Sequence, residues 1–284
     1  MSNTDDSAQS FVDLLPAKQR QAIVAMFGDT FAQSFMGPIA FIDDAQLSSP
    51  TVTTFFRRDF PFISRVLNYE YQYRSWNGFD QELLNRYGDL ITKKLENITL
   101  LLTRWTERFN KLLEANGVKM ESAVYSNAVL TTVPIISGHA RAYFHVLKEL
   151  DRLNLAAGTA NLYGVITSTQ RAEAEFTCKK AVRAFAAALR NEVLKLYKEA
   201  GRLQREQQGR GQVEPAQVAV IASQGTLLEE FGESMSGDAK ADRSLDLAGV
   251  DPGQVIDDAS AATVAAGKAS AKLRSKKDET LGIA

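Results

Sequence analysis

A run of nine large apolar residues between positions 84 and 112 constrains the fold of this chain more than any other feature. The intervals between them are 3, 4, 4, 3, 4, 3, 4 and 3 residues, with a mean of 3.5. That is the heptad period of a helix that packs along its length against other helices. We predict a helix over about 79–116, ended by Asn116-Gly117. At 1.5 Å per residue it is about 57 Å long, which indicates a bundle or a coiled coil.

Nine seam positions exceed what one partner helix in a small domain covers. We therefore expect the seam to mediate assembly into a homo-oligomer. The seam consists of Leu84, Tyr87, Ile91, Leu95, Ile98, Leu102, Trp105, Phe109 and Leu112.

Other apolar stripes at intervals of three and four residues predict helices on both sides of this one. They run over about 11–35, 62–73 and 140–153. A further long helix is expected from an N-cap at Ser168, with a stripe that ends near Ala200.

Segment 124–136 is rich in Val, Ile and Thr and is expected to be extended, for example as a hairpin. The apolar run Ile39–Ile42 fits a short buried extended segment, and 51–56 fits either a strand or a helix that opens after Pro50. The fold class is therefore mainly α: a helical bundle of about five helices, two of them long and amphipathic, with a small extended or hairpin element and disordered termini.

Composition divides the chain into three parts. Residues 1–10 contain no core-forming side chain and are expected to be disordered, whereas 11–205 contain enough apolar residues for one helical domain. Residues 206–284 are expected to be an acidic, disordered tail rich in Ala, Asp and Gly. Short helices around 217–231 and 255–272 are not expected to join the core.

The net charge of −1 is an average over unlike segments. Residues 1–56 carry net −4, residues 57–210 carry 24 bases and 16 acids for net +8, and residues 211–284 carry 12 acids and seven bases for net −5. Surface fields act within about a Debye length, so a basic body between acidic ends affects which partners bind, although charges also cluster by chance.

Several classes of protein are excluded or disfavoured. One cysteine excludes an intramolecular disulfide framework or a multi-cysteine zinc site within one chain. The sequence has no apolar stretch of transmembrane length and no signal peptide, so we expect a soluble, cytoplasmic protein without a membrane partner. Phosphate-binding glycine loops and a nucleophile elbow are missing as well. We therefore expect no catalytic residues, no cofactor and no metal, and the protein is predicted not to be an enzyme.

The few residues of catalytic type have ordinary explanations. His139 and His145 are six residues apart and face different directions on a helix, so they suit a capping role and a rim position better than a zinc pair. Cys178 falls on an apolar stripe and is expected to be a buried, inert thiol.

Basic residues interleaved with aromatics are the most suggestive chemical feature. That combination supports phosphate contact with base stacking, and it also arises from the solvated face of a helix beside its core stripe. We assign a candidate nucleic-acid face to two segments. Its residues are Arg57, Arg58, Arg65, Arg74, Arg171, Lys179, Lys180, Arg183 and Arg190.

The order of elements over about 76–190 resembles the AcaB-like proteins of conjugative plasmids and integrating conjugative elements. The matching residues are Trp76-Asn77-Gly78-Phe79-Asp80, Val133-Pro134-Ile135-Ile136, Ala140, Tyr143, Leu147 and Asp151, Leu162-Tyr163-Gly164, and the bases from Arg171 to Arg190. The resemblance implies a transcriptional regulator or another DNA-associated accessory of a mobile element. The chain departs from the family in lacking a recognisable ribbon-helix-helix segment and in carrying an acidic C-terminal segment.

Two hypotheses follow. The first is a non-catalytic, DNA-associated regulatory or accessory protein of a mobile genetic element, acting in transcription or conjugation, with double-stranded DNA as partner. The alternative is a helical scaffold or structural oligomer that binds a protein partner, for example through its acidic tail, and has no nucleic-acid role.

Overall fold

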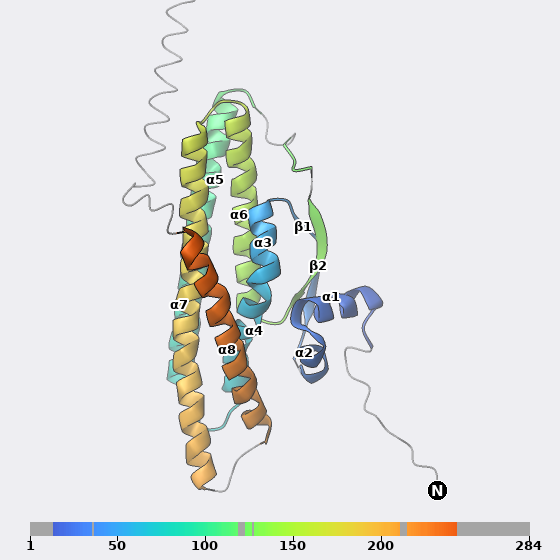
Figure 1. Cartoon of the computed structure of the whole chain (residues 1–284), viewed down its shortest axis with the longest axis vertical. Coiled ribbons are helices and arrows are strands. Elements are labelled where there is room, and N and C mark those ends of the chain that lie inside the picture. Colours follow the sequence, from blue (N-terminus) through green and yellow to red (C-terminus); the bar gives the residue numbers. More distant parts are fainter. Residues whose placement is uncertain (1–13, 36, 119–122, 127, 211–214, 243–284) are drawn as a thin grey trace, which may run out of the picture.

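The computed structural model describes residues 14–35, 37–118, 123–126, 128–210 and 215–242. Over these residues the chain forms eight helices and a two-stranded sheet (Figure 1). In order they are α1 (Ala17–Phe27), α2 (Asp29–Ser34), β1 (Ala40–Leu47), α3 (Pro50–Arg58), α4 (Phe60–Arg74), α5 (Gln81–Ala115), β2 (Val129–Ile135), α6 (Gly138–Leu162), α7 (Ser168–Gly209) and α8 (Pro215–Asp242). The mainly α prediction is confirmed, with more helices than the five expected. Residues 1–10, predicted to be disordered, lie outside the described part of the chain.

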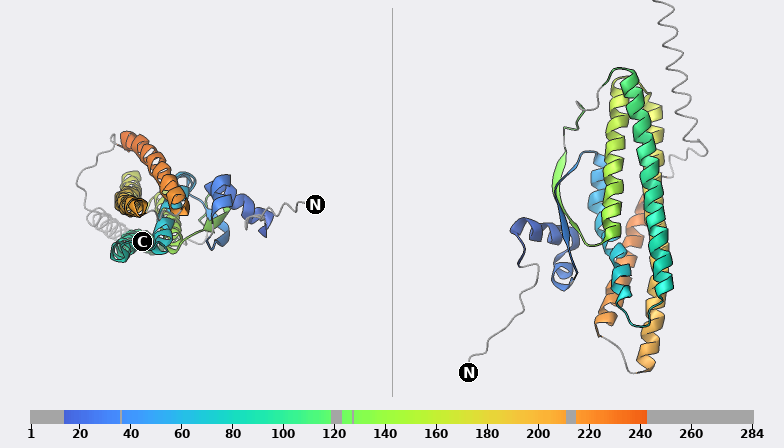
Figure 2. Two further views of the ribbon diagram at one scale, coloured as in Figure 1. Left: turned by 90° about the horizontal axis from the view of Figure 1, so that it is seen from below. Right: turned by 180° about the vertical axis from the view of Figure 1, so that it is seen from behind.

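Helices α5, α6 and α7 form the centre of the molecule and pack against one another. α5 and α6 run in the same direction and α7 runs antiparallel to both (Figures 1 and 2). α3 and α4 pack against α6, and α8 packs against α7 and α4. Because α5 and α6 are parallel, the chain must travel back along the bundle between them, and β2 lies on this return path.

The heptad seam of α5 is the core of this bundle. Eight of the nine predicted residues are buried, whereas Leu112 is partly buried and Leu113 takes its place. A helix turns once in 3.6 residues rather than 3.5, so after four heptads the buried position moves on by one residue. α6 and α7 of the same chain contact α5 and cover the seam. The seam therefore gives no argument for self-association, and the homo-oligomer stays a prediction.

The two long helices begin at side-chain caps. The Asp80 carboxylate accepts a hydrogen bond from the Leu83 amide at 3.0 Å at the start of α5. At the start of α7, Thr167 and Gln170 form a capping box, so the N-cap lies one residue before the predicted Ser168.

The extended element is a ribbon between distant segments and not a local hairpin. β1 pairs antiparallel with β2, from Ala40 opposite Ile135 to Leu47 opposite Val129. The predicted extended runs at 39–42 and 124–136 are thus partners in one sheet. A bulge interrupts the register between Ile42 and Ala45.

Segment 51–56 is helical, and a residue from another helix explains why. The backbone amides of Ser48 and Ser49 donate to the Asp151 carboxylate of α6, with a shortest distance of 2.6 Å. This carboxylate satisfies amides just ahead of α3, and Pro50 occupies the first turn without needing a donor. The strand alternative for 51–56 is wrong.

The predicted stripe over 11–35 is divided between two helices. Gly28 separates α1 from α2 and has a φ of +85°, a backbone conformation that residues with a side chain rarely adopt. Ile23 and Phe27 of α1 and Ala32 of α2 form a small second core with Ile136, beside the ribbon.

The predicted boundary at residue 205 is wrong. α7 continues to Gly209, and α8 packs on the bundle with Ile221, Leu227 and Leu228 in the main core. Sequence reasoning underestimated α8 because its buried residues Ile221, Leu227 and Leu228 are set among Ala, Gly, Ser and Gln and form no long apolar stripe. Residues 243–284 of the predicted tail lie outside the described residues.

Two glycines let α8 approach α7. A Cβ at Gly225 would stand 3.0 Å from the Tyr197 hydroxyl, and one at Gly232 would stand 2.5 Å from the Arg190 guanidinium. The glycines are seven residues apart, and so are the two residues of α7 that they face. Glycine costs about 1 kcal/mol in a helix interior, and here it provides the space that the contact requires.

Candidate nucleic-acid interface

Two basic segments that are far apart in the chain approach each other through a contact between α7 and α3. The Arg183 guanidinium lies over the ring of Phe55, 5.8 Å from its centroid. Arg58 is one turn from Phe55, and Lys179 and Lys180 are one turn from Arg183. We call Arg58, Lys179, Lys180 and Arg183 the α3–α7 basic patch. Four of the nine predicted nucleic-acid residues belong to it.

The patch contains four bases, one of which pairs with a buried acid. Arg58 donates two hydrogen bonds to the buried Asp59 carboxylate, at 2.5 and 3.0 Å. Lys179 and Arg183 are half-buried, and Lys180 is exposed. An excess of bases on this surface is suitable for contact with phosphate groups.

The other five predicted residues do not join the patch. Arg74 is committed to an ion pair with Glu70 at 2.7 Å, and Arg171 to one with Glu175 at 2.7 Å. The hydrogen bond with Glu175 raises the pKa of Arg171. Arg65 lies over the Phe31 ring, while Arg190 lies under α8 and Arg57 lines a cavity on the other side of α3. The nine residues therefore do not form one continuous face.

The lower half of α7 carries further exposed bases that the prediction of site residues omitted. Lys195 pairs with Glu192 at 2.8 Å, and Arg202 pairs with both Glu199 and Glu206 at 2.5 Å. Ion pairs at these spacings also occur on the solvated face of an ordinary helix. The sequence therefore gave no signal that distinguishes these bases from the bases of such a face. Two exposed bases of this half, Lys198 and Arg205, have no acid pair among the described residues.

The basic helix α7 and the acidic helix α8 lie side by side. α7 carries nine bases and five acids for net +4, and α8 carries five acids and one base for net −4. Glu229 and Glu230 of α8 are exposed. The acidity of residues 211–284 is concentrated in 211–242, at net −5, because 243–284 carry six acids and six bases.

The two histidines bind different partners. His139 Nδ1 lies 3.3 Å from the Glu70 carboxylate, and its Nε2 lies 3.1 Å from the Thr92 hydroxyl. The exposed His145 lies 3.9 Å from Glu149. His139 is not the cap of α6, because the Ser137 hydroxyl accepts from the Ala140 amide instead.

Cys178 is fully buried on α7, and burial raises the pKa of its thiol to about 12. A thiol with this pKa is protonated at neutral pH and unreactive, which confirms the prediction of an inert core cysteine. Within the described ranges, no three His, Cys, Asp or Glu side chains are grouped so as to hold a metal ion. No described helix has the length and apolar character of a membrane span.

The fold is thus a helical bundle with a two-stranded ribbon and a basic patch where Arg183 of α7 lies over Phe55 of α3. No family model and no curated protein matches the chain. Among solved structures, the crystal structure of selenomethionine-containing AcaB from uropathogenic E. coli matches with a TM-score of 0.54 and 21% identity. The match covers 62% of this chain and 88% of the AcaB chain. The AcaB-like resemblance is therefore supported at the level of the fold.

Proposed function

We propose that this chain is a non-catalytic, DNA-associated regulatory or accessory protein of a mobile genetic element. The observation that carries the proposal is the α3–α7 basic patch, in which two basic segments distant in sequence share one surface. The likeness in fold to AcaB supports the connection with mobile elements, because AcaB-like proteins are the family that the sequence resembles.

The expected mode of action is neutralisation of phosphates. Lys179, Lys180 and Arg183 would contact the backbone of duplex DNA and release its counterions, which gives affinity and a steep dependence on salt. Arg183 is already oriented by Phe55, so little side-chain entropy is lost when it binds. Sequence preference would require additional contacts to base edges.

A paired variant tests the patch. Binding of the full chain to a labelled duplex of random sequence is measured by fluorescence anisotropy from about 50 to 200 mM salt. We expect Lys179→Gln with Lys180→Gln to weaken binding and to flatten the slope of log K against log salt by about 1 to 2. The matched control is Lys93→Gln with Lys94→Gln, two adjacent lysines on α5 of which one is likewise exposed and the other half-buried.

Two outcomes would contradict the proposal. One is the absence of binding at the lowest salt concentration. The other is an equal loss in both lysine pairs, since that would indicate attraction to any basic surface of the protein.

The scaffold alternative depended on an exposed heptad seam, and in the fold that seam is covered by α6 and α7. It remains distinguishable by size-exclusion chromatography with light scattering. An obligate high-order oligomer that is indifferent to DNA would replace the DNA-associated function with the scaffold.

A further inference from the structure

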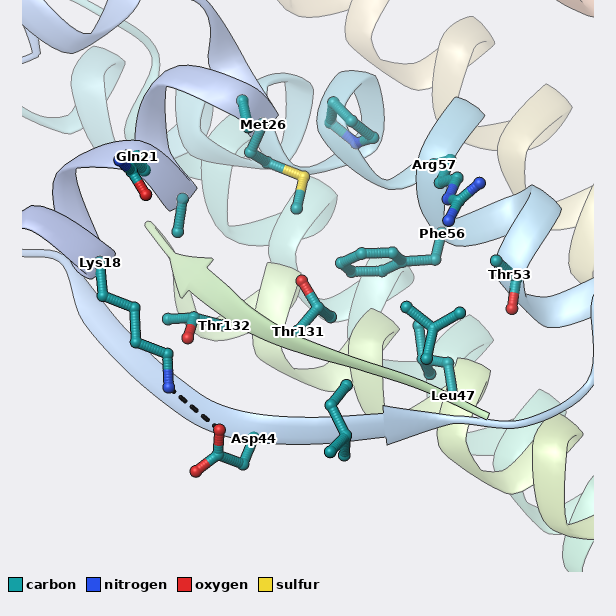
Figure 3. Close-up of a pocket in the computed structure, with 15 residues that line it drawn as sticks. Lys18, Gln21, Met26, Asp44, Leu47, Thr53, Phe56, Arg57, Thr131 and Thr132 are labelled. Atoms are coloured by element: carbon teal, nitrogen blue, oxygen red, sulfur yellow. Dashed lines mark hydrogen bonds and ion pairs between the residues drawn. The ribbon is translucent and has the colours of Figure 1, made fainter. Parts of the chain in front are cut away.

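A cavity of about 570 Å³ lies between α1, α3 and the β1–β2 ribbon (Figure 3), and none of its lining residues belongs to the α3–α7 basic patch. Cavities that bind small molecules are typically about 300–1,000 Å³. Five elements contribute to the lining, because α4 adds Pro61 to the two helices and two strands around the cavity.

The cavity separates two hydrophobic cores. Phe56 and Leu47 belong to the main core, whereas the small core of α1 and α2 lies on the other side. Met26 packs against both. In Figure 3 the Met26 thioether, the Phe56 ring and the Thr131 hydroxyl point toward the same space. A thioether and an aromatic ring are adaptable, polarizable walls for an apolar group.

The ribbon bulge forms one side of the opening. Asp44 has a φ of +51°, a conformation uncommon for a residue other than glycine. It accepts a hydrogen bond from Lys18 of α1 at 3.0 Å, and its neighbour Asp43 accepts one from Thr132 at 3.1 Å. The bulge thus ties α1 to the ribbon across the cavity, and bulges commonly redirect side chains beside functional sites.

The charged groups of the lining leave a positive balance. Lys18 and Asp44 neutralise each other. The third charged residue is Arg57, which is exposed and has no acid partner among the described residues. A guanidinium beside an apolar floor and a hydroxyl is an arrangement that recognises a carboxylate or another oxyanion attached to an apolar body.

We propose that this cavity binds a small organic anion with an apolar body, whose charged group pairs with Arg57 while its body lies between Met26 and Phe56. The proposal is independent of DNA binding. It assigns to Arg57 a role in ligand binding in place of the nucleic-acid role that the sequence predicted.

The Met26 methyl group allows the site to be observed directly. Of the five methionines of the chain, Met26 lies in the cavity lining, and a Met26→Leu variant assigns its signal in the spectrum of the ¹³C-methyl-methionine protein. The probes are 2-naphthoate and its neutral analogue 2-naphthol. An aromatic ring beside the methyl group shifts its resonance, and we expect a saturable shift with tighter binding of the carboxylate.

Two variants and a control test the assignment. Arg57→Gln is expected to weaken 2-naphthoate about tenfold, the loss of one charge-assisted hydrogen bond, and to leave 2-naphthol unchanged. Ala25→Phe fills the cavity from the exposed side of α1 and is expected to abolish the shift for both probes. Arg104→Gln, at an exposed arginine of α5 outside the lining, should change neither.

The proposal is overturned if the Met26 resonance shows no saturable shift with either probe. It is equally overturned if 2-naphthoate binds the Arg57→Gln and wild-type proteins with the same affinity, because the charge would then be recognised elsewhere. A shift that survives Ala25→Phe would place the probe outside the cavity.

Discussion

Buried polar side chains of α6 join separate elements of this bundle by hydrogen bonds. Asp151, which belongs to the motif of the AcaB-like resemblance, accepts hydrogen bonds from the amides of Ser48 and Ser49 ahead of α3. Asn154, one turn further along α6, donates to the Ser49 hydroxyl at 2.8 Å. Both side chains are buried, so their polar groups have little access to water. Asp151, a residue of the resemblance motif, therefore has a structural role in joining β1 to α3.

We expect Asp151→Ala to lower the free energy of unfolding by about 2 kcal/mol, since it leaves two amides without their acceptor. Urea denaturation followed by circular dichroism measures this loss. Asp89→Ala on the exposed face of α5 is the matched control and should change stability by less than about 0.5 kcal/mol. A loss of equal size in both variants would contradict the capping role.

Glu70 is a buried carboxylate with two basic neighbours, His139 and Arg74. Burial would raise the pKa of Glu70, but hydrogen bonds from His139 and Arg74, together with their charges, lower it below its usual value. The ionised form therefore stabilises the fold above the pKa of the unfolded chain, and this contribution is lost as pH falls through the pKa of the folded state. Gly88 leaves room for the carboxylate, because a Cβ there would stand 2.9 Å from its Oε1.

The Glu70→Gln variant should consequently be less stable than the wild type by about 1–3 kcal/mol at pH 7. The difference should shrink in acid, where the wild type also loses the charge. Urea midpoints at a series of pH values measure it, with Glu107→Gln on the exposed side of α5 as control. A difference that stays constant down to low pH would show that ionisation of Glu70 does not matter.

At the scale of elements, the attachment of α8 depends on shape as much as on apolar area. Among the described residues of α8, only three large apolar side chains are buried, and the helix adds polar contacts such as the hydrogen bond between Tyr73 and Gln224. Gly225 and Gly232 admit the long side chains of Tyr197 and Arg190. A side chain at either glycine should therefore weaken the packing of α8 on the bundle.

Gly225→Val is expected to destabilise the protein by about 1–3 kcal/mol and to speed amide hydrogen exchange in α8, because the new side chain meets Tyr197. Gly201→Val on α7 is the control, since a Cβ at Gly201 has no atom within 4 Å. Mass spectrometry with peptide resolution would distinguish local release of α8 from global destabilisation. Unchanged exchange in α8 would contradict the shape argument.

For the whole molecule, the distribution of charge differs from the one that the linear sequence suggested. The negative C-terminal charge lies on α8, which packs directly against the basic α7, and not on residues 243–284. An acidic helix at that distance lowers the positive potential that DNA encounters at α7. Competition with DNA is therefore expected from α8 itself.

We expect Glu229→Gln with Glu230→Gln to strengthen DNA binding about threefold at low salt, with a smaller effect at high salt. A variant that ends at residue 242 should bind DNA with unchanged affinity, because the removed segment carries no net charge. Anisotropy titrations of both variants measure the effect. If only the shortened variant bound DNA more tightly, the charge that competes with DNA would lie in residues 243–284 and not on α8.

Periodicity in the sequence was sufficient to predict the long helices, because the side chains that a helix buries recur at its own repeat whatever covers them. The α5 seam and the Cys178 stripe of α7 were correct for this reason. Periodicity does not show which neighbouring surface buries an apolar stripe. Only the tertiary structure decided that α6 and α7, and not a second copy of the chain, bury the α5 seam. Tertiary contacts likewise made 51–56 helical through Asp151 and brought α8 into the core through Gly225 and Gly232. They also divided nine basic residues between a patch, a cavity, two ion pairs and contacts with Phe31 and α8, since charges far apart in sequence become neighbours only when the chain folds.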